Sequence, residues 1–188
     1  MPYPAKTSHQ EIIAAALSIA EQQGQEALSM RSLAKSLGIR ASSLYGYFPD
    51  REALLIALAD EVTRRLHAEL QGAAKGLPPG EALNAVAYAY VDFAREHGNL
   101  YDVITVARES RQPSSGPGKE LWNFLLAQVG SITHQQDDTA SAVALWSLLH
   151  GFVSLERMGL FGASGPRRGL EAGLDAMLRG FGQLTQDT

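Results

Sequence analysis

The chain has 188 residues, of which 45% are hydrophobic and 19% are charged, and its formal net charge is -4. This composition supplies enough apolar surface for a folded core, and the absence of cysteine excludes disulfides and thiolate metal sites. The acidic balance argues against a general coat for nucleic acid, although a local basic patch can still bind DNA. The lack of cysteine also fits a reducing cytoplasm, which is the expected location.

The first apolar stretch, residues 12–20, has a length that also occurs in signal peptides, but its flanks predict a folded helix. Ser8 and Glu11 form an S-x-x-E capping box before the stretch, and Glu21 follows it. No run reaches the roughly 18 to 20 apolar residues that a membrane span needs. We therefore expect a soluble protein with no membrane partner.

Helical spacing recurs along the whole chain, whereas no convincing strand pattern is present. After the first helix, the expected helices lie at about 29–38, 40–46, 50–72, 80–97, 99–109, 118–134, 140–161 and 166–184. Glycine- and proline-rich segments at 76–81 and 111–118 separate them. The sequence predicts an all-α fold of about nine helices, with a three-helix domain at 1–50 and a larger helical bundle at 51–188.

Residues 29–48 read as a helix, a turn at Gly38 and a second short helix. Small Ala34 permits a close approach of two helices, and Gly38 tolerates the left-handed conformation of a tight turn. The inner face is apolar and consists of Leu33, Ala34, Leu37, Ile39, Leu44 and Phe48. This pattern predicts a helix-turn-helix, whose second helix enters the major groove of DNA. A plain helical corner within a bundle is the alternative.

Hydroxyl, aromatic and basic side chains surround the thin inner face of the second helix. They are Arg40, Ser42, Ser43, Tyr45 and Tyr47. Such groups suit phosphates and base edges, and residues 31–51 carry four basic side chains against Asp50 alone. Tyr45 taken alone also fits a packed tyrosine whose hydroxyl stays in water.

One segment resembles the N-terminal domain of the TetR (tetracycline-repressor-like) transcriptional regulators: IIAAALSIAEQQGQEALSMRSLAKSLGIRASSLYGYFPDREALLIAL, residues 12–58. It has the family's Ala-rich first helix, glycine turn, S/T-L-Y-x-x-F motif and basic residue at the start of helix four. The stretch WSLLHGFVSLE, residues 146–156, is similar to the Trp-x-x-x-His-Gly stretch of one class of TetR C-terminal domains. The resemblance implies a DNA-binding regulator, specifically a repressor that a small apolar effector releases from a palindromic operator.

The resemblance also implies which residues face the bases. Arg31 stands where the family has a base- or phosphate-contacting residue on helix two. Ala41, Ser42 and Ser43 fall on the base-facing positions of helix three. Ala41 offers only apolar contact, for instance to a thymine methyl group.

Contacts to the DNA backbone are implied for three further residues. Tyr45 and Tyr47 fall on the family's backbone-contacting aromatic positions. Arg51 replaces the usual phosphate-gripping lysine and keeps its charge. Gly46 removes a side chain that many relatives point at DNA, so base readout is expected to be sparse.

Aromatic residues outside the head are candidates for an effector cavity, because small-molecule sites are mostly apolar with a few polar groups. The candidates are Tyr88, Phe93, Tyr101, Trp122, Trp146 and His150. Filling the core is the alternative for the aromatic residues, and a hydrogen bond to a backbone carbonyl is the alternative for His150. No histidine spacing brings two metal ligands onto one helix face, so neither a metal nor another cofactor is expected.

The expected helix at 140–161 is apolar around most of its circumference, so a second surface must cover it. Together with the helix at 166–184, it is predicted to form a homodimer, because one short reading helix spans too few base pairs. No catalytic motif occurs, so no enzyme and no catalytic residues are expected. The rival interpretation is a helical ligand-binding or scaffold protein without DNA-binding activity.

Overall fold

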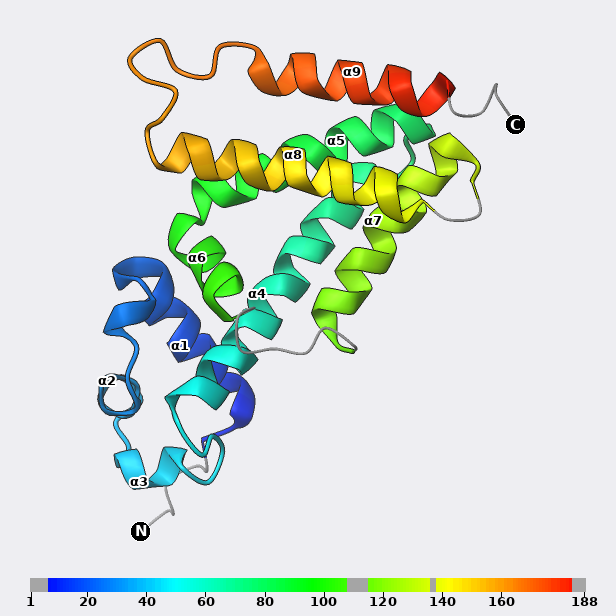
Figure 1. Ribbon diagram of the computed structural model, residues 1–188. Coiled ribbons are helices and arrows are strands. Elements are labelled where there is room, and N and C mark those ends of the chain that lie inside the picture. Colours follow the sequence, from blue (N-terminus) through cyan, green and yellow to red (C-terminus); the bar gives the residue numbers. More distant parts are fainter. Residues whose placement is uncertain (1–6, 108–114, 136–137, 184–188) are drawn as a thin grey trace. The chain divides into compact units, whose positions relative to one another are not determined.

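The computed structural model describes residues 7–107, 115–135 and 138–183. Within these ranges the chain forms nine α-helices, one short 3-10 helix and no strand, which confirms the predicted all-α fold (Figure 1). The elements are α1 (His9–Gln23), η1 (Gln25–Ala27), α2 (Met30–Ser36), α3 (Ala41–Leu44), α4 (Arg51–Ala74), α5 (Pro79–Glu96), α6 (Gly98–Ala107), α7 (Pro117–Thr133), α8 (Thr139–Arg157) and α9 (Gly169–Gln183). Part of the loop expected at 111–118 lies outside the described residues.

The helices group into two compact units. Of the described residues, one unit comprises 7–65, 96–107 and 115–118, and the other comprises 66–95, 119–135 and 138–183. Helix α4 contributes its first part to one unit and its last part to the other. Helix α6 belongs to the same unit as α1, although the two are far apart along the chain, and Asn99 Nδ2 of α6 donates to Glu21 O of α1 over 2.8 Å across 78 positions.

Helix α1 begins and packs as its sequence predicts. The hydroxyl of Ser8 accepts a hydrogen bond from Glu11 N at 3.1 Å, and the Glu11 carboxylate accepts one from Ser8 N at 2.7 Å. This capping box satisfies backbone donors that the first helical turn would otherwise leave unpaired. The buried face is the predicted one and consists of Ile12, Ile13, Ala16, Leu17 and Ala20.

Helices α8 and α9 lie side by side in the second unit (Figure 1). A Cβ added to Gly173 of α9 would stand 3.2 Å from the Leu148 Cδ1 of α8, so the absence of a side chain permits this close approach. Helix α8 ends at Arg157, four residues before the expected end, because Gly159 adopts a left-handed conformation with a φ of 70°.

An ion pair joins α5 to the end of α8. Arg95 donates from Nε to Glu156 Oε2 and from Nη2 to Glu156 Oε1, each over 2.8 Å, and Nη1 donates to Asp92 Oδ1 over 3.2 Å. These hydrogen bonds from Arg95 lower the pKa of Glu156 from its ordinary value of 4.5. The paired geometry stabilises the contact more than a single bond between exposed charges would.

Substituting Glu156→Gln should lower the free energy of unfolding at neutral pH by about 0.5 to 1 kcal/mol, because the pair is only partly shielded from water. A carboxyl whose pKa is lowered by folding stabilises above its unfolded pKa, and this contribution is lost as the pH falls through the folded value. Urea unfolding experiments at decreasing pH should therefore show the difference between the two proteins shrinking as the Glu156 carboxyl becomes protonated, below the ordinary glutamate range.

The matched control is Glu171→Gln, which removes the exposed partner of Arg168 within the start of α9. It should leave the unfolding midpoint unchanged. An equal effect of both substitutions would contradict the role given to the bridge between α5 and α8.

Candidate nucleic-acid interface

The segment from α2 to α3 has the local geometry of a helix-turn-helix. Ser29 caps α2, accepting from Ser32 N at 3.0 Å, while Ser32 Oγ accepts from Ser29 N at 2.9 Å. At the other end, Gly38 has a φ of 65° and Ile39 N donates to Ala34 O over 3.0 Å. This is a Schellman turn, in which glycine takes the left-handed position at no steric cost. The turn expected at Gly38 is confirmed.

Buried apolar side chains hold the two helices together. Leu33 and Leu44 are fully buried, and Ala34 and Phe48 are 3% exposed, whereas the remaining predicted inner residues, Leu37 and Ile39, are half-buried. Helix α3 has four residues, and its N-terminal flank Arg40 makes no side-chain cap. The position of α3 therefore depends on the burial of Leu44 and on the chain that follows it.

Five of the candidate DNA-contacting side chains are exposed: Arg31, Arg40, Ser42, Ser43 and Tyr45. Tyr45 is 54% exposed, which is unusual for a large aromatic residue. Ala41 is half-buried at the start of α3. The short helix thus presents hydroxyl groups on its outer side while Leu44 points into the unit.

Tyr47 and Arg51 differ from the other candidates, because their donors are used within the same unit. The hydroxyl of the half-buried Tyr47 donates to the carbonyl of Thr7. The Arg51 guanidinium donates from Nε to Leu28 O over 2.7 Å and from Nη2 to Gln25 O over 2.8 Å. The sequence contained no signal for these bonds, since their acceptors are backbone carbonyls.

Asp50 caps the start of α4. Asp50 Oδ1 accepts a hydrogen bond from Ala53 N at 2.8 Å. The negative charge of Asp50 also interacts favourably with the partial positive charge of the helix N-terminus. Both effects favour a start of α4 at Arg51.

The structure brings three of the candidate effector residues together. The ring centroids of Trp122 and Trp146 are 6.0 Å apart, and those of Trp146 and His150 are 6.2 Å apart. On α5, Phe93 is buried and Tyr88 is half-buried. Tyr101 is buried on α6 and belongs to the other unit, where it contributes to the core of α1 and α6.

His67 is a further candidate for effector binding that the sequence did not indicate. Its ring lies 5.2 Å from that of Phe124, and its Nε2 atom is buried without a hydrogen-bond partner. A buried polar atom without a partner costs free energy and is rare in folded proteins. The sequence around His67 did not indicate a buried polar group, because Arg64 and Arg65, which shortly precede it on the same long helix, are typical solvent-facing residues.

A surface groove between α1 and α4 is lined by apolar Ile13 and Leu17 and by charged residues of α4. Glu61 accepts from Arg64 at 2.7 Å and lies 3.7 Å from Arg65. Glu61 therefore pairs with two of the basic side chains that line the groove. Within the described part of the chain, no three potential metal-ligating side chains cluster, and no helix is long and apolar enough to cross a membrane.

Family comparison identifies the class of protein. Residues 12–58 match the family model of bacterial regulatory proteins of the tetR family, and residues 83–181 match that of tetracyclin repressor-like C-terminal domains. The second match alone covers more than half of the chain. The chain belongs to the TetR family. It is a DNA-binding transcriptional regulator, and the segment from α2 to α3 is its helix-turn-helix.

Individual relatives agree with this assignment. The TetR-family chain is 28% identical over 165 residues to an uncharacterised HTH-type transcriptional regulator of Mycobacterium tuberculosis, over 84% of this chain and 73% of the relative. A protein of unknown function from Rhodococcus has the same fold, with a TM-score of 0.79 at 24% identity over 95% of this chain and 98% of that one. A TetR variant of Acinetobacter baumannii in complex with minocycline aligns with a TM-score of 0.68 at 20% identity, over 95% and 98% of the two chains.

Proposed function

We propose that this TetR-family regulator is a repressor that binds a palindromic operator as a homodimer and releases it when a small apolar effector binds. The observation that supports DNA reading by α3 is its orientation. Leu44 is fully buried, whereas Ser42 and Ser43 of the same short helix and Tyr45, which directly follows it, are exposed. In this proposal residues 1–50 form the reading head and residues 51–188 bind the effector and the second subunit.

The exposed side chains suit distinct parts of a duplex. Arg31 and Arg40 can bind phosphate or the O6 and N7 atoms of guanine. Ser42 and Ser43 can donate to or accept from base edges and phosphates, and the Tyr45 hydroxyl reaches the DNA backbone. Ala41 supplies apolar contact to a thymine methyl group. Tyr47, whose hydroxyl donates to Thr7 O, supports the head from within.

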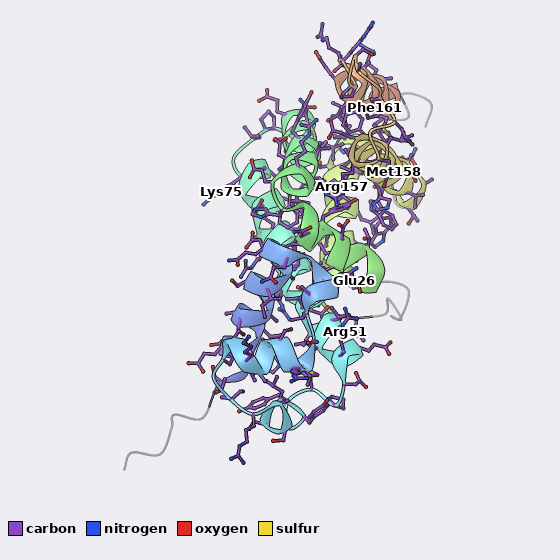
Figure 2. The ribbon with its side chains drawn as sticks, turned by 90° about the vertical axis from the view of Figure 1, so that its left-hand side faces the viewer. Glu26, Arg51, Lys75, Arg157, Met158 and Phe161 are labelled. Carbon is purple, nitrogen blue, oxygen red and sulfur yellow. The ribbon has the colours of Figure 1, made fainter. Side chains whose placement is uncertain are left out.

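Helix α8 supplies a surface for a second subunit. Its buried face consists of Ala142, Leu145, Leu149, Phe152 and Val153. Helical spacing places Val143 and Leu155, each 44% exposed, outside this buried face, and Met158, which directly follows α8, is 69% exposed (Figure 2). A stripe of exposed apolar and small residues on a regular helix fits an isologous helix packing, in which α9 joins beside α8.

The ring cluster of Trp122, Trp146 and His150 is the proposed centre of effector binding. Aromatic rings with a few polar atoms are typical of small-molecule sites. His67, with its buried unpartnered Nε2, belongs to the same unit and supplies a second polar group that a ligand could satisfy. The minocycline complex of a structural neighbour concerns another protein, but it agrees with an effector-binding role for this fold.

Replacing Arg40 by alanine should weaken operator binding about tenfold and lower the slope of log affinity against log salt by about one, because one phosphate contact is lost. Replacing Tyr45 by alanine should weaken binding with a smaller change in slope.

Duplexes retained by the purified protein from a random library supply the operator, and fluorescence anisotropy at several salt concentrations measures affinity. Lys75→Ala, at an exposed residue outside the head and outside α8 and α9, is the charge-matched control and should bind as wild type. Absence of any retained duplex would contradict the proposal.

Leu155→Arg should dissociate the dimer, because it places a charge on the exposed apolar stripe of α8. The control is Leu77→Arg, since Leu77 is 41% exposed, close to the 44% of Leu155, and lies outside α8 and α9. Sedimentation equilibrium should show a lower association constant for Leu155→Arg alone. A wild-type protein that remains monomeric would contradict the proposed assembly.

Compounds that release the operator should also change the intrinsic tryptophan fluorescence. The sequence contains two tryptophans, and both Trp122 and Trp146 are in the proposed site, so this signal reports on the site directly. A screen of apolar compounds should find ligands that lower operator affinity and quench fluorescence at the same concentration. Release of the operator without any fluorescence change would place effector binding elsewhere.

A further inference from the structure

We infer that Arg51 is a positioning residue of the reading head, which holds the ends of the helix-turn-helix together instead of gripping phosphate. The inference rests on the proposed role of α3 in contacting DNA. It reinterprets the one position at which this chain has arginine where the family pattern has lysine.

The hydrogen bonds of Arg51 connect two distant points of the chain. Arg51 is the first residue of α4, and its acceptors are the carbonyls of Leu28 and Gln25, 23 and 26 positions earlier. Residues 29–50, which contain α2, the turn and α3, lie between these points. One guanidinium therefore closes the whole reading segment into a loop, and we call this contact the Arg51 clasp.

The Arg51 clasp holds the start of the segment that carries α3. Leu28 directly precedes Ser29, the cap of α2, and its side chain is fully buried. A four-residue helix has too few internal hydrogen bonds to hold its own position, so α3 depends on fixed ends of the segment that carries it. Hydrogen bonds from a charged donor are stronger than neutral ones, which suits a contact that restrains about twenty residues.

The same contact competes with phosphate binding. Nε and Nη2 form one edge of the planar guanidinium, and the two carbonyls occupy that edge. Glu26 Oε2 lies 3.9 Å from Nη2, and Figure 2 shows Glu26 and Arg51 close to one another. A phosphate that approached this edge would have to displace both carbonyls, and one that approached Nη2 from the other edge would meet the negative charge of Glu26.

Lysine cannot replace this contact. Its single ammonium group presents no pair of parallel N–H donors, whereas the arginine fork matches two acceptors side by side. Lysine does bind phosphate as a point charge. Arg51→Lys therefore separates the two roles, because it removes the clasp and retains the charge.

The test compares Arg51→Lys and Arg51→Ala with Arg40→Lys and Arg40→Ala, using the selected operator at several salt concentrations. We expect both Arg51 variants to weaken binding about tenfold with the salt slope of the wild type. Arg40→Ala should lower that slope by about one, and Arg40→Lys should restore it. Hydrogen exchange in the DNA-free protein should be faster at the amides of η1 and α2 in Arg51→Lys, with unchanged helicity and association.

The inference would be overturned if Arg51→Lys bound the operator as tightly as wild type while Arg51→Ala lowered the salt slope. Arg51 would then be a phosphate contact. Unchanged hydrogen exchange in Arg51→Lys would overturn it as well. If Arg51→Ala fails to fold, the comparison of Arg51→Lys with Arg40→Lys still distinguishes the clasp from phosphate binding. A wild-type protein that retains no operator would contradict the proposed function, while the exchange measurement tests the clasp independently of DNA.

Discussion

The reading head depends on one constraint: a helix of four residues cannot hold itself in place. Helix nucleation is unfavourable, and α3 ends before its internal hydrogen bonds can offset that cost. The side chain of Leu44, fully buried, supplies the anchor, and the left-handed turn at Gly38 sets the direction of approach. The outer side of α3 is consequently free to carry hydroxyl and aromatic groups that contribute little to folding.

This arrangement explains why the polar atoms around α3 divide into two classes. Ser42, Ser43 and Tyr45 are exposed, whereas the donors of Tyr47 and Arg51 bond to backbone carbonyls within the unit. The bonds of Tyr47 and Arg51 restrain the segment that carries the exposed Ser42, Ser43 and Tyr45. In the proposed function, a head with so few outward side chains reads a short stretch of DNA, which is why the proposal includes a second subunit.

The second unit distributes apolar surface differently. Helix α8 buries one face in its own unit and leaves Val143 and Leu155 exposed, as is Met158 directly after it, while α9 packs beside α8 at Gly173. The paired hydrogen bonds from Arg95 to Glu156 tie the last turn of α8 to α5. The exposed stripe therefore belongs to a helix whose position is restrained at its end and along its length.

The sequence by itself determined the helices, the caps at Ser8, Ser29 and Asp50, and the turn at Gly38, because these depend on bonds between residues three to five positions apart. Tertiary structure decided which polar groups stay available. The bonds from Arg51 span 23 and 26 positions and that from Tyr47 spans 40, and all end on backbone carbonyls, which every residue carries. A backbone acceptor has no residue type, so no sequence pattern could reveal that these donors were already used.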